Sequence, residues 1–157
     1  EYRRQRQMCI RDRAHAVELA NGPLKIETER PSTDLAAHYE LAASNGLSFS
    51  AVDNGWLIAA AGLMPLWPGV AEAWLLASSR VDRHPVTIGR LVRQGLFEKI
   101  ETEQLHRVQA VMRSDQPMLL RWARFLGMKH EGQMLAYDQR RADYDRWAWT
   151  RKDDEWA

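Results

Sequence analysis

The apolar and polar positions in the middle of the chain alternate in the way that β-strands require. Residues 47–52 (LSFSAV) place apolar and polar side chains on opposite faces, and residues 53–55 (DNG) are typical of a hairpin turn. Residues 56–62 (WLIAAAG) are therefore predicted to be the returning strand, and the two prolines of residues 64–70 predict a loop after it. Residues 72–78 (EAWLLAS) predict a third strand, whose nearly continuous apolar run indicates burial on both faces.

The apolar positions that follow recur with the period of an amphipathic helix. Pro85 suits the first turn of this helix, which we expect to end near Glu103. Its apolar stripe consists of Ile88, Leu91, Val92, Leu96 and Ile100.

A fourth strand and a second helix come next. Residues 108–112 (VQAVM) predict the strand. Ser114 or Asp115 is predicted to cap the helix, and Gly127 is predicted to end it. The side chains expected to face the core are Met118, Leu119, Trp122, Phe125 and Leu126.

The remaining segments complete the order of elements. Residues 15–20 and 35–44 predict helices, and residues 129–137 and 144–150 predict two final strands. The order is then two helices, three strands, a helix, a strand, a helix and two strands. It predicts one mixed α/β domain in which helices pack on both faces of a mostly antiparallel sheet.

Composition narrows the class of protein. The chain has 157 residues, of which 45% are hydrophobic and 27% charged, and this fits a single domain with a buried core. No apolar run approaches the roughly 18 residues of a membrane helix. The single cysteine, Cys9, excludes an internal disulfide and a zinc site built from cysteines, and the histidines lack metal-ligand spacing. We therefore expect no metal, and a cytoplasmic location.

The start of the chain differs from the rest. Residues 8–13 (MCIRDR) match the translation of a transposon end used in sequencing adapters. We therefore expect residues 1–13 to be a non-native tail and residues 14–157 to be the domain. We also expect a native first strand to be missing. The alternative is a basic arm for nucleic acid or anionic lipid. The tail carries five arginines, Glu1 and Asp12, so the net charge of +1 becomes −2 without it. No nucleic-acid or membrane partner is therefore predicted.

Three stretches carry a resemblance to a known family. They are SFSAVDNGWLIAAAG at residues 48–62, GVAEAWLLAS at residues 69–78 and RWARFLGMKHEGQMLAYD at residues 121–138. Together with the order of elements, they resemble the GNAT superfamily of acetyl-CoA-dependent N-acetyltransferases, and most of all the divergent GNAT-like proteins of tailed phages. The resemblance implies a parallel, splayed pair of central strands, here residues 74–78 and 108–112, with the pantetheine arm of the cofactor between them.

The resemblance also implies a phosphate-binding loop where the helix of Pro85 begins. His84, Thr87 and Gly89 take the positions of the family's Arg or Gln and of its two glycines, so one glycine is replaced. The residues implied to bind the cofactor are Leu76, Ala77, Ser78, Arg83, His84, Thr87, Gly89 and Arg90, and Arg80 is a further source of positive charge. The alternative is a polar helix start with ordinary surface arginines.

Glu72 is the implied general base, because some family members use a glutamate of this strand to accept the proton of the amine. The alternative is a solvated carboxylate at the end of a strand. The family commonly also has a tyrosine that protonates the departing thiolate, four residues before the glycine that ends the last helix. Here that residue is Ala123, and Ser114 and Tyr137 are substitutes by proximity alone.

Two classes of function are therefore open. The first is an N-acyltransferase that uses acetyl-CoA and an amine acceptor of unidentified structure. The second is a non-catalytic GNAT-fold protein of a phage particle or a host-interaction pathway, which the altered loop and the missing tyrosine favour. The location is correspondingly the cytoplasm of a bacterial host or a phage particle, with virion proteins as partners in the second case.

Overall fold

The computed structural model describes residues 47–53, 56–83 and 85–152. The elements in chain order are β1 (Ser48–Asp53), β2 (Trp56–Trp67), β3 (Val70–Ala77), the 3-10 helix η1 (Ser79–Arg83), α3 (Pro85–Thr102), β4 (Arg107–Arg113), α4 (Pro117–Phe125), β5 (Lys129–Met134) and β6 (Tyr144–Thr150). The helices predicted at residues 15–20 and 35–44, and the tail at residues 1–13, lie outside the described residues.

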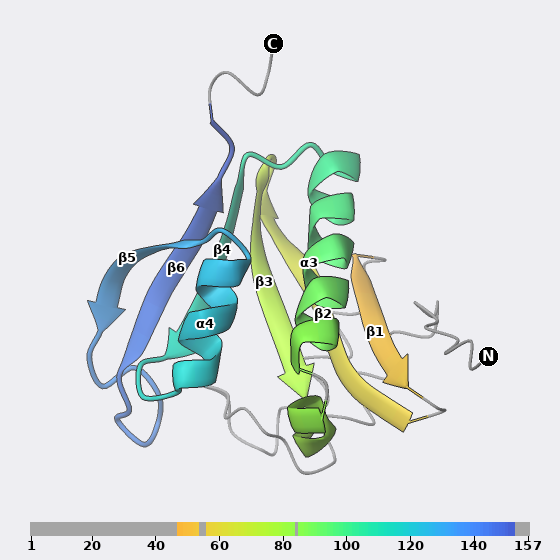
Figure 1. Cartoon of the computed structure of the whole chain (residues 1–157). Coiled ribbons are helices and arrows are strands. Elements are labelled where there is room, and N and C mark those ends of the chain that lie inside the picture. The colour runs from red at the N-terminus through yellow and green to blue at the C-terminus, as the bar shows by residue number, and fades with distance from the viewer. Residues whose placement is uncertain (1–46, 54–55, 84, 153–157) are drawn as a thin grey trace, which may run out of the picture.

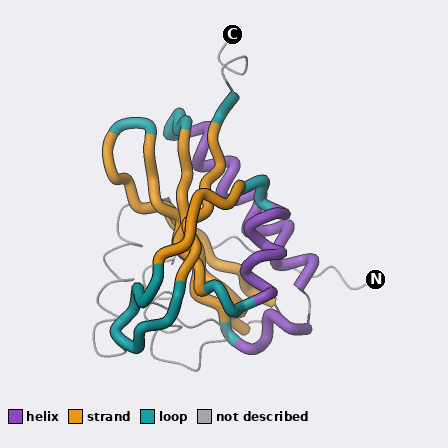
Figure 2. Tube along the Cα trace, turned by 90° about the vertical axis from the view of Figure 1, so that its left-hand side faces the viewer, coloured by secondary structure: helices purple, strands orange, loops and turns teal. Residues whose placement is uncertain are grey.

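The strands form one sheet in the order β1-β2-β3-β4-β6-β5, in which β3–β4 is the parallel pair. Helices α3 and α4 lie beside each other on one face of the sheet (Figure 1), and the turned view shows a helical layer against a sheet layer (Figure 2). This arrangement confirms the predicted mixed α/β fold with a mostly antiparallel sheet. Within the described residues, no helix is both long and apolar enough to cross a membrane.

The core lies between the sheet and these two helices. The predicted stripe of α3 is buried at Ile88, Val92, Leu96 and Ile100. Small and branched side chains of β2 and β3 meet it, among them Ala59, Ala61, Leu63 and Ala77. Gly95 allows α3 to approach β1 closely, because a Cβ atom there would lie 2.7 Å from the ring of Phe49.

The prediction of a loop at residues 64–70 is wrong. Strand β2 continues past Gly62 to Trp67, and only Pro68 and Gly69 separate it from β3. The strand pairing between β1 and β2 stops at Gly62, so the later part of β2 is an edge on that side and tolerates the missing N–H of Pro65. Gly69 turns the chain with a φ of 83°, which favours glycine.

The predicted cap of α4 is also wrong. The helix begins at Pro117, and its N-cap is Gln116, which makes no side-chain capping bond. A proline suits this position because the first helical N–H groups have no partner within the helix. Neither Ser114 nor Asp115 therefore caps α4; Asp115 instead accepts a hydrogen bond from Arg113 Nε at 2.7 Å.

The predicted inward face of α4 is correct except at one residue. Leu119, Trp122 and Leu126 are buried, and Met118 is partly buried. Phe125 is 45% exposed, because it lies about 100° around the helix from the middle of that face. It lies on the side of α4 that faces α3. Gly127, with a φ of 78°, ends the helix as predicted.

Candidate active site

Strands β3 and β4 run parallel and then separate. Their paired residues are Val70–Arg107, Ala71–Val108 and Glu72–Gln109. Beyond these pairs β3 stays paired with β2 as far as Ala77, and β4 stays paired with β6 as far as Arg113. The strands therefore form a V, with its apex at Glu72 and its open end beside the start of α3 (Figure 1). This confirms the predicted divergence.

The short helix η1 carries the chain from β3 to α3. The Ser78 hydroxyl donates a hydrogen bond to the Ile58 carbonyl oxygen at 3.0 Å, and the Ser78 backbone N–H donates to the same oxygen at 2.9 Å. Val81 is completely buried and anchors η1. These contacts place the exposed Arg83 directly before α3, at the open end of the V.

The other predicted cofactor residues lie around the same point. Leu76, Ala77 and Gly89 are buried, Ser78 and Thr87 are half-buried, and Arg83 and Arg90 are exposed. His84 lies outside the described residues. The structure places Leu76 and Ala77 at the end of β3, Arg83 at the end of η1, and Thr87, Gly89 and Arg90 in the first turns of α3. The role of all these residues in binding stays a prediction.

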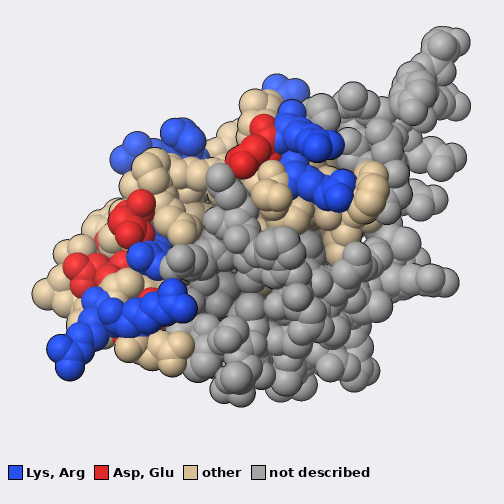
Figure 3. All heavy atoms as spheres, turned by 90° about the horizontal axis from the view of Figure 1, so that it is seen from below, with Lys and Arg blue, Asp and Glu red and all other residues tan. Residues whose placement is uncertain are grey.

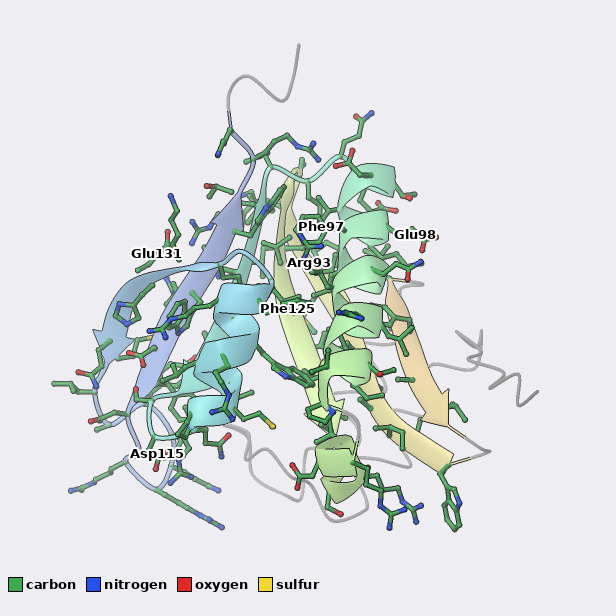
Figure 4. All side chains as sticks on the ribbon, viewed as in Figure 1. Arg93, Phe97, Glu98, Asp115, Phe125 and Glu131 are labelled. Atoms are coloured by element: carbon green, nitrogen blue, oxygen red, sulfur yellow. The ribbon has the colours of Figure 1, made fainter. Side chains whose placement is uncertain are left out.

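A side chain of α4 covers Gly89. A Cβ atom at Gly89 would lie 3.6 Å from Cε1 of Phe125. Arg93 follows one turn later on α3, and its guanidinium lies 5.8 Å from the centre of the Phe125 ring and 5.1 Å from that of Phe97. Arg93, Phe97 and Phe125 lie on the facing sides of the two helices (Figure 4). The sequence prediction missed this contact because it assigned Phe125 to the core.

The facing parts of the helices are positively charged. Residues 85–97 of α3 and all of α4 contain no Asp or Glu. The arginines in these two segments are Arg90, Arg93, Arg121 and Arg124, all of them exposed. Viewed from the open end of the V, basic side chains form groups on the described surface, with some carboxylates beside them (Figure 3). Arg80 does not join the others, because its guanidinium stacks 3.7 Å above the ring of Trp56.

Glu72, the predicted base, lies at the apex of the V. It is the last residue of β3 that pairs with β4, and it is half-buried. Its neighbour Ala71 belongs to the core under the helices. Because successive side chains of a strand alternate between its faces, Glu72 lies on the face of the sheet opposite α3 and α4.

An ion pair near Glu72 ties β4 to β5. Gln109, the partner of Glu72, accepts a hydrogen bond from Arg107 Nε at 3.2 Å. Arg107 also donates to both carboxylate oxygens of Glu131, one of them at 2.9 Å. This bond holds the pKa of the Glu131 carboxyl below its usual value. The pairing crosses β6, and the sequence alone gave no signal for it.

The position of the family tyrosine lies in the core. Ala123 is completely buried there. Tyr137 lies in the connection from β5 to β6, and its ring centre is 5.3 Å from that of Tyr144. In the sheet order, β6 and β4 lie between β5 and β3, so Tyr137 is far from β3. Ser114 follows β4 at the open end of the V, and its hydroxyl is buried with no hydrogen-bond partner among the residues described.

A second contact that the sequence prediction missed joins β5 to β6. His130 Nε2 lies 2.9 Å from Asp145 Oδ1, and the edge of the His130 ring packs on Trp147 with the centroids 5.2 Å apart. The alternation of residues along the final hairpin is the signal that could have indicated it. No group of three metal-ligating side chains occurs in the part of the chain that the structure describes.

No protein-family model matches the chain, and no curated protein is significantly similar to it. Solved structures, in contrast, are similar over nearly its whole length. An acetyltransferase of the GNAT family from Streptococcus pneumoniae superposes with a TM-score of 0.71 at 13% identity, covering 95% of this chain and 99% of that one. The chain has the GNAT fold.

Two further structures share this GNAT fold with the chain. Ribosomal-protein-alanine N-acetyltransferase from Brucella melitensis has a TM-score of 0.68 at 15% identity, covering 93% of this chain and 99% of that one. A candidate acetyltransferase from Salmonella typhimurium, solved with its cofactor acetyl-CoA, has a TM-score of 0.71 at 15% identity, covering 97% of this chain and 96% of that one. These structures confirm the fold that the sequence resemblance implied.

Proposed function

We propose that the chain is an N-acetyltransferase that uses acetyl-CoA to acetylate an amine. The observation that carries the proposal is the V of β3 and β4, which opens beside the start of α3. Diverging strands present unpaired peptide groups along their inner edges, and an extended chain with amide groups, such as a pantetheine arm, can bind there as an added strand does. The free N–H groups at a helix start favour a pyrophosphate.

The predicted residues form two groups, one for the pantetheine arm and one for the pyrophosphate. The end of β3, at Leu76, Ala77 and Ser78, is the edge for the pantetheine arm. Arg83, His84, Thr87, Gly89 and Arg90 surround the pyrophosphate. Two features support this division. Arg83 and Arg90 are exposed, and the nearby helix surfaces in residues 85–97 and α4 lack carboxylates that would repel an anion.

Glu72 is the proposed base. The amine nitrogen attacks the thioester carbonyl, its N–C bond forms as the C–S bond breaks, and its proton passes to Glu72 directly or through water. The position of Glu72 at the apex supports this role, because the reacting end of the arm would lie there when the phosphates lie at the open end.

Calorimetric titration with acetyl-CoA tests the proposal. With one glycine of the loop replaced, we expect a Kd on the order of tens of micromolar, which is about −6 kcal/mol. Arg83→Ala and Arg90→Ala should each weaken binding about tenfold, whereas Arg140→Ala, which removes the same charge from the β5–β6 connection, should not. Glu72→Gln should keep this Kd and lower the rate of CoA release in the presence of amines. An absence of both heat and a thermal shift at millimolar acetyl-CoA would exclude the proposed enzyme.

That negative result would favour the alternative, a GNAT fold without catalysis in a phage particle or a host-interaction pathway. One observation favours this alternative. Ala123 offers no proton donor for a departing thiolate, and it lies wholly in the core. A protein that only binds a partner through this fold has no need of such a donor.

A further inference from the structure

We propose that Phe125 is a gate on the cofactor site, which acetyl-CoA must displace in order to reach the first turns of α3. The inference rests on the proposed function. In the structure the Phe125 ring covers the one glycine that remains from the phosphate-binding loop. The gate therefore controls the affinity of the site rather than the chemistry at Glu72.

The position of the ring carries the inference. Gly89, Arg93 and Phe97 are spaced four residues apart, so they form one stripe along α3. This stripe faces α4, and Phe125 points into the space between the two helices, whereas Glu98 points away from it (Figure 4). A Cβ atom added at Gly89 would lie 3.6 Å from Cε1 and 3.8 Å from Cδ1 of the ring, so the space between the glycine and the ring is just large enough for a methyl group. A phosphate cannot approach Gly89 from this side while the ring is there.

The contacts that hold the ring are weak enough to be exchanged for a ligand. Phe125 is 45% exposed, and the buried face of α4 is formed by other residues, Leu119, Trp122 and Leu126. One of its neighbours is the guanidinium of Arg93, 5.8 Å from the ring centre, and such a cation–π contact contributes little at an exposed site. Rotation of Phe125 about its Cα–Cβ bond therefore uncovers Gly89 without disturbing the packing of α4.

Movement of the ring also changes Arg93. In the structure its guanidinium lies near the ring centres of both Phe97 and Phe125, at 5.1 Å and 5.8 Å. When Phe125 moves away, Arg93 loses one of these neighbours, and its exposed head group becomes available to an anion one turn above Gly89. The same displacement that opens the site therefore adds a positive charge to it, so the two residues act together.

Two measurements on the full chain test the gate. The first compares the Kd of acetyl-CoA for the wild type, for Phe125→Ala, and for the control Leu135→Ala, which removes an exposed apolar side chain from the β5–β6 connection. We expect Phe125→Ala to bind about threefold to tenfold more tightly and the control to bind as the wild type does. The second uses 4-fluorophenylalanine labelling, which gives one 19F resonance for each of the 3 phenylalanines. The resonance that is absent from Phe125→Ala should shift on saturation with acetyl-CoA.

The outcomes separate the gate from the function that it serves. Binding by the wild type that leaves the Phe125 resonance unchanged, or that weakens in Phe125→Ala, overturns the gate and leaves the proposed function intact. Binding by Phe125→Ala alone supports a gate that is closed in the wild type. If neither protein binds acetyl-CoA, the proposed function fails and the gate fails with it.

Discussion

Gly95 and Gly89 show, at the scale of single residues, how a missing methyl group is used in two ways on one helix. At Gly95 the space is filled by the buried ring of Phe49, which sets the distance between α3 and β1. At Gly89 the nearest ring, that of Phe125, is at ordinary contact distance and half exposed. The first glycine serves packing, and the second leaves a backbone that a ligand can approach once the Phe125 ring has moved.

Gly95→Ala should therefore destabilise the protein, whereas Gly89→Ala should not. Alanine normally stabilises a helix interior relative to glycine by about 0.5–1 kcal/mol, and Gly89→Ala should show this gain or no change. Gly95→Ala forces a carbon into the ring of Phe49, and we expect a net loss of about 1–3 kcal/mol. Urea unfolding of both variants measures the difference. Equal free energies of unfolding would contradict the packing described here.

At the scale of elements, the apolar pattern of the sequence predicts those elements whose structure depends on neighbouring residues in the chain. Eighteen residues with a helical apolar period define α3, and four of the five predicted stripe residues are buried, whereas Leu91 is half-buried. The extension of β2 was missed because Pro65 and Pro68 indicate a loop, and only the end of the β1 pairing shows that a proline is tolerated there. Phe125 was misplaced because it lies about 100° around α4 from the middle of the buried face, a position that the apolar pattern alone does not separate from the core. The parallel pairing of β3 and β4 followed from the family resemblance, since apolar patterns do not reveal which strands pair.

The ion pair of Arg107 and Glu131 joins β4 to β5 across β6, and it should make stability depend on pH. The pKa of Glu131 is lowered in the folded protein, chiefly by the hydrogen bond from Arg107. The stabilisation is then present above the ordinary value of 4.5 and is lost as the pH falls through the lower value of the folded state. For a partly exposed pair we expect about 0.5 kcal/mol.

Denaturant unfolding between pH 6 and about pH 3 tests this pair. The free energy of unfolding of the wild type should fall more steeply below pH 4.5 than that of Glu131→Gln. Glu98→Gln, which alters an exposed carboxylate of α3, should follow the wild type. Parallel curves for the wild type and Glu131→Gln would show that the ion pair does not contribute.

At the scale of the whole molecule, one surface is expected to bind acetyl-CoA. The open end of the V of β3 and β4 and the start of α3 lie at one end of the described fold, and Glu72 lies at the apex of the V. The β5–β6 connection joins the last two strands of the sheet, and β4 and β6 separate β5 from β3. A ligand that binds as proposed should therefore protect one region of the chain and leave the other unchanged.

Hydrogen–deuterium exchange with and without saturating acetyl-CoA tests this claim most directly, because it reports where the ligand binds as well as whether it binds. The account predicts slower exchange of the backbone amides in residues 73–78 at the inner edge of β3 and in residues 85–90 at the start of α3. It predicts unchanged exchange in residues 135–143 between β5 and β6. Unchanged exchange throughout, or protection confined to the β5–β6 connection, would contradict a cofactor site in the V.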